Sequence, residues 1–375
     1  MKGMTGMDVK KKISSVVMAG MLGMSAVYGS YVLTPPPQAE ASIIGDVIGS
    51  VANAAIAKKQ AREYIKYYNN DEKGRQEFMT KVKEQYKEDK SGLYNDRLNM
   101  IITSLSGAIA SIDPSINDKP YAYYVNDDES FNAFCTLGHN MSVNKGLFSI
   151  LDNNDEIAVV LGHEMGHGQK DHPAKGMDKV INKQAIASIL VSATGDTAVG
   201  NAVGSIALNQ SIAKTTKKQE WEADNLSFDY IIHSNFNPGA TAAVWQRVID
   251  KSGNNEQNSL GAFLDPSDHP TNLERRDNYV NKLYEFSGNH VTVKDGTVYV
   301  NDKVFTKPAA YGSMSAAERS YFVLGNLAAA YHNGHSKNDI TVNNGVVMMG
   351  VQPIMTAVSG DEAADVLAKR LQEIK

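Results

Sequence analysis

Apolar residues recur at helical spacing along much of the chain. Residues 43–110 alternate alanine-rich and charged stretches without a proline, which indicates helices. A further helix is predicted to begin after Asn153, because this N-cap residue is followed by Glu156 and then by apolar residues on one face. Other helical patterns occupy residues 174–215, as a hairpin of small residues, and residues 220–233 and 245–251.

Strand patterns are sparse before residue 287. Tyr121 to Val125 predicts a short strand that follows two proline-containing breaks. Residues 131–143 are mixed, with a glycine inside, and predict irregular strand and loop. Residues 253–270 contain Gly and Pro among polar residues and predict a loop. The first 286 residues therefore favour a mainly helical domain with a small sheet.

An internal repeat changes the character of the chain from residue 287 onward. Residues 291–298 and 340–347 share alternating apolar residues around an Asp-Gly or Asn-Gly hairpin turn. Each hairpin is followed by a helix-capping signal, Ser315 with Glu318 and Ser359 with Glu362. We therefore predict two β-β-α repeats that form a small C-terminal α/β domain over residues 287–375. The second repeat resembles a BON domain, an envelope-associated module, without its final returning strand.

The N-terminus has the order of a secretory signal peptide. Lys10 to Lys12 form a basic patch, residues 13–33 carry no charge, and Ala39-Glu40-Ala41 gives a cleavage pattern before Ser42. The apolar stretch is long enough that an uncleaved membrane anchor is the alternative. We expect cleavage after residue 41 and export to a periplasm or to the medium.

Composition narrows the classes of function. Hydrophobic residues make up 42% of the chain and charged residues 21%, as in ordinary globular proteins. The net charge of −5 provides no basic field for nucleic acid, so no nucleic-acid partner is expected. Cys135 is the single cysteine, which excludes an internal disulfide, and is expected to be a small buried apolar residue.

The segment from His163 to His167, with the sequence His-Glu-Met-Gly-His, carries the chemistry. On a helix, positions i and i+4 share a face, so both imidazoles can bind one zinc ion. Glu164 lies next to the first ligand and can take a proton from a zinc-activated water. Two such histidines can also be ordinary polar residues, but the apolar helix before them favours a partly buried site.

A catalytic zinc site needs a third protein ligand and an open position. His172 lies past the predicted helix end, where a structural or surface role is expected. Glu220 and Asp224 share a helix face, so Glu220 can complete the ligand set while Asp224 accepts a hydrogen bond from a ligand imidazole. Glu222 points elsewhere on that helix and is expected to be solvated.

Several motifs occur in a characteristic order: Asn132-Ala133-Phe134, Gly146-Leu147, residues 154–158, the histidine pair with Glu164, residues 220–224, and His269-Pro270 with Arg275. Together they resemble the HtpX-like, BepA-like and CAAX-prenyl-protease-like metallopeptidases, peptidase family forty-eight, over about residues 60–285. The resemblance implies an α+β fold of the zincin type and one Zn²⁺ per chain on His163, His167 and Glu220. It also implies Glu164 as the base and Asp224 beside the ligands.

The resemblance also suggests two further roles. Asn132, Ala133 and Phe134 would offer a strand edge to an extended substrate. His269 would approach the active site, either to occupy the open zinc position or to stabilise the oxyanion as a second catalytic residue. Arg275 would anchor the loop of His269 through a carboxylate, or remain a surface charge. Leu137-Gly138-His139 stands where the family often has a Pro-Gly-Gly turn.

The expected function is a zinc metalloendopeptidase that cleaves envelope or secreted proteins, with a role in envelope protein quality control. Its partners are protein or peptide substrates, and the C-terminal domain would associate peripherally with the envelope. The zinc metallopeptidase domain is assigned to residues 42–286. The alternative is a chaperone-like envelope protein that keeps the zinc fold but rarely cleaves.

Overall fold

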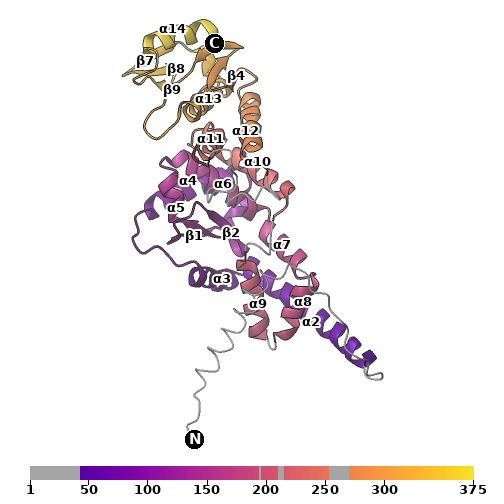
Figure 1. The fold of residues 1–375 in the computed structure, drawn as a ribbon. Coiled ribbons are helices and arrows are strands. Elements are labelled where there is room, and N and C mark those ends of the chain that lie inside the picture. The colour runs from indigo at the N-terminus through magenta and orange to yellow at the C-terminus, as the bar shows by residue number, and fades with distance from the viewer. Residues whose placement is uncertain (1–42, 194–195, 210–214, 253–269) are drawn as a thin grey trace. The chain divides into compact units, whose positions relative to one another are not determined.

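The computed structural model describes residues 43–193, 196–209, 215–252 and 270–375 (Figure 1). The predicted signal peptide, His269 and nearly all of the predicted loop over residues 253–270 lie outside the described residues. The chain divides into two units, Met1–Val51 and Ala52–Lys375, and every contact described below lies within the second. Among the helices described, none has the length and apolar character needed to span a membrane.

The N-terminal helical region consists of α2 (Ile43–Asn70), α3 (Glu72–Gln85) and α4 (Asn95–Ile112). Asp71 separates the first two, because its side chain accepts a hydrogen bond from the backbone N–H of Gly74 at 2.9 Å and caps α3. The helical pattern predicted for residues 43–110 is confirmed. A short 3-10 helix, η2 (Pro114–Asn117), follows α4.

A three-stranded sheet, with the order β1-β3-β2, follows these helices. Strand β1 (Ala122–Asn126) pairs parallel to β3 (Asn140–Asn144), and β2 (Ala133–Thr136) pairs antiparallel to β3. The turn η3 (Leu137–His139) joins β2 to β3, with positive φ at Gly138 and His139. A side chain at Gly138 would lie 2.5 Å from the backbone oxygen of Tyr68, so this close approach to α2 requires glycine.

The two helices that carry the chemical motifs pack against each other. The side chain of Asn153 caps α6 (Asn154–Gln169), accepting from the N–H of Glu156 at 2.8 Å, as predicted. Thr216 caps α10 (Lys217–Ile232) in a capping box with Gln219. Helix α5 (Lys145–Ile150) connects β3 to α6.

The stretch predicted as a helical hairpin over residues 174–215 is different in the structure. Its described residues form α7 (His172–Val180), α8 (Gln184–Ser192) and α9 (Asp196–Leu208). These three helices share an apolar cluster with α2 and α3. The hairpin prediction is wrong. Helix α7 ends after Val180, and the residues that follow contain no glycine or proline that would mark this break in the sequence.

Two helices lead into the C-terminal region. Helix α11 (Ala240–Ser252) begins earlier than the segment predicted from residue 245. Helix α12 (Asn272–Phe286) was not predicted, although Thr271 and Glu274 form a capping box at its start. Both helices pack against α13 (Ala316–His332). One apolar core therefore runs from α4 to the C-terminal helix α14 (Ala364–Ile374).

Each of the two C-terminal repeats contains three strands, so the prediction of two strands per repeat is wrong. The first sheet has the order β4-β5-β6 and the second the order β7-β8-β9. In each repeat the unpredicted third strand follows the second strand after a turn of only two residues. In the turn of the first repeat, Asn301 and Asp302 both have positive φ. The strands are β4 (Val291–Lys294), β5 (Thr297–Val300), β6 (Lys303–Thr306), β7 (Ile340–Asn343), β8 (Val346–Met349) and β9 (Gln352–Thr356).

The helix of each C-terminal repeat packs on strands of both repeats. Helix α13 packs on β4 and β5 of its own unit and on β9 of the other, whereas α14 packs on β7, β8 and β6. Ser315 caps α13 by accepting from the N–H of Glu318 at 3.1 Å, as predicted. The second predicted cap is wrong, because α14 begins at Ala364, and Glu362 instead pairs with Arg370 at 2.5 Å.

A buried ion network joins the C-terminal units to helix α6. Arg247 of α11 lies 3.0 Å from Glu156 at the start of α6 and 2.6 Å from Glu318 at the start of α13. All three side chains are buried. Burial, together with the charge of Glu318, raises the pKa of Glu156. The contact fixes the first turn of the helix that carries both histidines.

Candidate metal centre and active site

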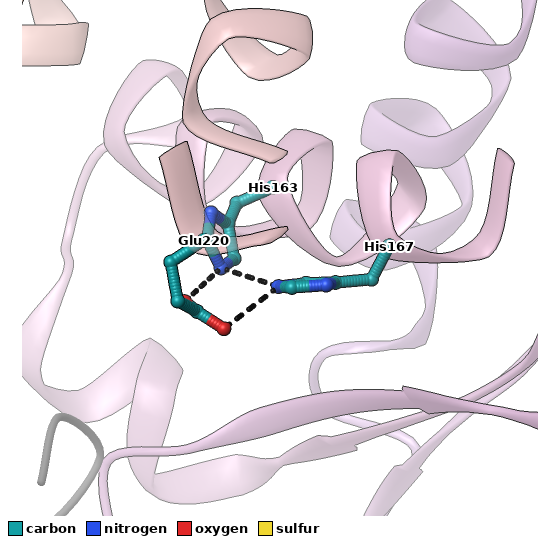
Figure 2. A group of neighbouring side chains, drawn as sticks. All are labelled: His163, His167 and Glu220. Atoms are coloured by element: carbon teal, nitrogen blue, oxygen red, sulfur yellow. Dashed lines mark hydrogen bonds and ion pairs between the residues drawn. The ribbon is translucent and has the colours of Figure 1, made fainter. Parts of the chain in front are cut away.

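Three side chains meet between α6 and α10. The Nε2 atoms of His163 and His167 lie 3.0 Å apart, and the Glu220 carboxylate spans both rings (Figure 2). Its Oε2 lies 3.3 Å from Nε2 of His163, and its Oε1 lies 3.4 Å from Nε2 of His167. One ligand atom from each residue lies within 4.8 Å of the other two, and all three residues are buried.

These distances and donors fit a zinc ion. Ligand atoms at 2.0–2.1 Å from a tetrahedral zinc ion lie about 3.3 Å from one another. The distances from the two Glu220 oxygens to the imidazoles match that spacing, whereas the two imidazole nitrogens, at 3.0 Å, lie slightly closer to each other. Two imidazoles and one carboxylate are also the protein ligands of one class of catalytic zinc site, which keeps a fourth position for water or substrate. The arrangement is therefore a possible metal-binding triad.

Two glycines let Glu220 reach the histidines. A side chain at Gly166 would lie 3.1 Å from the backbone oxygen of Ala223, and one at Gly162 would lie 3.0 Å from Oγ of Ser227. Both are tighter than ordinary contacts, so the small residues allow α6 and α10 to pack closely. Ser227 adds a hydrogen bond to the backbone oxygen of Val159 at 2.8 Å.

Asp224 lies behind His163, one turn of α10 from Glu220. Its Oδ1 is 2.9 Å from Nδ1 of His163, and its Oδ2 accepts from Nε of Arg275 at 2.8 Å. Arg275 also donates to Oδ1 from Nη2, which lies 3.0 Å from Nδ1 of His163, and it stacks 3.7 Å from the ring centre of Trp245. Burial alone would raise the pKa of Asp224, but Arg275 and His163 outweigh burial and lower it.

Arg275 therefore binds a carboxylate, and the surface-charge alternative is wrong. Its side chain is fully buried. The sequence motif identified the residue, but its partner is the aspartate behind His163. The loop residue His269 lies outside the described residues, so its two expected roles stay predictions.

Glu164 lies beside the histidines and faces strand β2. Its Oε2 accepts a hydrogen bond from the backbone N–H of Cys135 at 3.0 Å. Burial raises the pKa of Glu164 to about 7. Cys135 as a residue is partly buried, and burial of its thiol raises the pKa of that group. The backbone amide of Cys135 thus contacts the site, which no side-chain motif could indicate.

His172 and Glu222 lie near His167. The Nδ1 atoms of His167 and His172 are 2.8 Å apart, and Nε2 of His172 is 3.2 Å from Oε2 of Glu222. His172 is buried, so a surface role for it is wrong. Burial, followed by the effect of His167, lowers the pKa of His172 to about 4. Glu222 is half-exposed but binds this ring instead of facing only solvent.

The predicted substrate strand lies at one edge of the sheet. Asn132 accepts a hydrogen bond from the backbone N–H of Asn144 at 3.0 Å, so its backbone faces β3. Because pairing alternates along an antiparallel ladder, the backbone groups of Ala133 and Cys135 point away from β3, on the side where the N–H of Cys135 meets Glu164. The ring of Phe134 packs against Tyr86, with ring centres 4.8 Å apart.

His139 follows this strand and makes the turn sensitive to acid. Its ring stacks on Tyr121 at 4.3 Å, and its Nδ1 lies 2.6 Å from the backbone oxygen of Lys119. Burial lowers the pKa of His139 from 6.5 to about 4. The unfolded chain therefore binds this proton first as the pH falls.

We expect His139 to contribute a loss of stability between pH 6.5 and pH 4. The shift corresponds to at most about 3 kcal/mol in the free energy of unfolding, present above pH 6.5 and lost on acidification. Urea unfolding at pH 7.5 and 4.5 measures it, with His139→Gln as the comparison. The expectation fails if the variant and the unaltered protein lose the same free energy between the two pH values.

Comparison with known proteins agrees with this geometry. Residues 95–281 match the sequence model of peptidase family M48. A beta-barrel assembly-enhancing protease of Yersinia pestis is 28% identical over 171 residues, 43% of this chain and 34% of the relative. Metalloprotease LoiP of Escherichia coli is 28% identical over 182 residues, 46% of this chain and 66% of the relative.

A eukaryotic relative shares the same region. The mitochondrial metalloendopeptidase OMA1 of Saccharomyces cerevisiae is 28% identical over 187 residues, 47% of this chain and 53% of the relative. The chain thus spans between 34% and 66% of the length of these relatives. Since the matched residues include α6 and α10 with the three converging side chains, the chain belongs to peptidase family M48.

Proposed function

We propose that the chain is a zinc-dependent metalloendopeptidase that acts outside the cytoplasm. The convergence of His163, His167 and Glu220 on one point, with Glu164 beside it, carries the proposal. The N-terminal signal pattern supports export, which sequencing the N-terminus of the mature, secreted protein would test. We infer envelope or secreted proteins as substrates, a role in envelope protein quality control, and peripheral envelope association through residues 287–375.

The chain supplies the groups that peptide hydrolysis needs. A zinc ion bound by the three side chains would lower the pKa of a water ligand to roughly 7 and polarise the scissile carbonyl. Glu164 takes the proton of the attacking water and delivers it to the leaving amine. Without metal, burial raises the pKa of Glu164 to about 7, and the charge of a bound zinc ion would lower that pKa and favour the ionised form that accepts a proton. Asp224 holds the ring of His163 in the tautomer whose Nε2 is free to bind a metal.

Strand β2 is the proposed binding site for the substrate backbone. An extended peptide can pair with this edge through the backbone of Ala133 and the carbonyl of Cys135, because the N–H of Cys135 already binds Glu164. Such pairing places a carbonyl of the peptide next to Glu164. Main-chain pairing would also tolerate varied substrate side chains. A structure with a bound peptide inhibitor tests the proposal: we expect backbone hydrogen bonds to Ala133 or Cys135, and their absence would reject this mode of binding.

Metal analysis tests the ligand set directly. Purified protein is expected to contain one zinc ion per chain, and His163→Ala or His167→Ala should remove both the zinc and the peptidase activity. His335→Ala, in the C-terminal region, is the matched control and should retain both. Full zinc content in both ligand variants would refute the assignment.

A further inference from the structure

A sharp turn returns His172 to the metal-site helix. Asp171, between α6 and α7, adopts the left-handed region with φ of 49°. Its carboxylate accepts hydrogen bonds from Asn69 and from Lys119, each at 3.0 Å. A continued helix would direct residue 172 away from His167, since i and i+5 do not share a face. The turn instead brings the two rings to 5.0 Å between centres, inclined by 66°.

The contact between the two histidines is part of a series of three hydrogen-bonded polar groups, which begins at a proposed metal ligand. Nδ1 of His167 lies 2.8 Å from Nδ1 of His172, and Nε2 of His172 lies 3.2 Å from Oε2 of Glu222. The His172 side chain is 1% exposed and the Glu222 side chain is 44% exposed. This series of hydrogen bonds therefore runs from the buried metal site to the protein surface.

The carboxylate at the outer end determines where the protons lie. A neutral imidazole has one N–H donor and one acceptor nitrogen, and an ionised carboxylate only accepts. Glu222 therefore favours the proton of His172 on Nε2, which leaves Nδ1 of His172 as an acceptor. The proton of His167 then lies on Nδ1, and the lone pair of its Nε2 faces His163 and Glu220.

We propose that His172 and Glu222 are positioning residues, which fix the tautomer and ring orientation of His167 for metal binding. The inference rests on the proposed zinc-dependent function. It gives His167 a partner of the same kind that Asp224 provides for His163. Such partners commonly change metal affinity by about 10–100-fold when removed.

Zinc affinity, measured by competition with a chelator, tests the proposal in two comparisons. The first sets His172→Phe against the unaltered protein, and the second sets Glu222→Leu against Glu222→Gln. His172→Phe keeps a ring but removes the acceptor, so zinc affinity should fall by about 10–100-fold relative to the unaltered protein. Glu222→Leu and Glu222→Gln both remove the charge, but only glutamine keeps an oxygen that can accept from Nε2 of His172. The leucine variant should bind zinc more weakly than the glutamine variant. Equal affinities in these two variants would overturn the proposal.

A spectroscopic measurement separates positioning from a purely structural role. In zinc-free protein labelled with ¹⁵N-histidine, the ring nitrogens of His167 should show the proton on Nδ1. The same resonances should shift toward a tautomer mixture in Glu222→Leu. An unchanged tautomer, with unchanged zinc affinity in His172→Phe, would overturn the proposal.

The two levels of inference fail in different ways. Failure of the unaltered protein to bind zinc would contradict the proposed function. Normal zinc binding that is insensitive to Glu222→Leu would contradict only the positioning role. Should His172→Phe not fold, the two Glu222 variants still decide the question, because Glu222 is half-exposed and contributes little to the core.

Discussion

Glu164→Gln is expected to abolish peptide hydrolysis while one zinc ion per chain stays bound. Glutamine has nearly the same volume and keeps an oxygen that can accept the N–H of Cys135, so the packing of α6 against β2 is retained. It cannot take the proton of the attacking water. Loss of a positioned general base lowers turnover by about 10²–10⁴-fold.

Cleavage of casein or of a quenched fluorescent peptide measures this loss, and metal analysis of the same samples measures the zinc. Glu285→Gln, at an exposed position of α12, is the matched control and should keep both activity and metal. Turnover of Glu164→Gln near that of the control would mean that Glu164 is not the base. An unaltered protein that binds unfolded proteins but never cleaves them would favour the chaperone-like alternative.

Local patterns predicted the parts of the site that lie within one helix. The cap at Asn153, the apolar face that follows and the spacing of His163 and His167 all depend on neighbours in sequence. Glu220 and Asp224 were also identified, because their spacing on a second helix fits one ligand and one partner. In the structure, the carboxylates of Glu220 and Asp224 lie 3.3 and 2.9 Å from the ring nitrogens of His163, and their roles at a metal stay proposals.

Contacts that depend on backbone direction could not be predicted. The return of His172 to His167 requires the left-handed conformation of Asp171, and most aspartates do not adopt it. The position of the Cys135 amide depends on the strand register, since a shift of one residue would turn it toward β3.

The third strand of each C-terminal repeat was not predicted, for a related reason. Strand β6 is four residues long and follows a two-residue turn without glycine, and β9 contains Pro353, which argues against a strand in sequence terms. Both are stabilised by packing against the helix of the other unit, which is a tertiary effect. Helix α12 is different, because the capping box of Thr271 and Glu274 is a local signal for the start of a helix.

Asp224→Ala is expected to damage both stability and metal binding, for separable reasons. Arg275 is fully buried and would lose its carboxylate partner. Breaking a buried ion pair by removing one member costs about 3–5 kcal/mol in the free energy of unfolding. His163 would also lose the acceptor of its Nδ1 proton, which should weaken zinc binding by about 10–100-fold.

The double variant Asp224→Ala with Arg275→Met separates these effects. Without the buried guanidinium, no uncompensated charge remains, so urea unfolding of the zinc-free protein should show much of the lost stability restored. Zinc affinity, measured by chelator competition, should stay low, because the thioether of methionine is only a weak acceptor and does not replace the carboxylate at Nδ1 of His163. If the double variant instead recovers the zinc affinity of the unaltered protein, Asp224 acts only by neutralising Arg275. The orientation of His163 would then have to come from the packing of α6 alone.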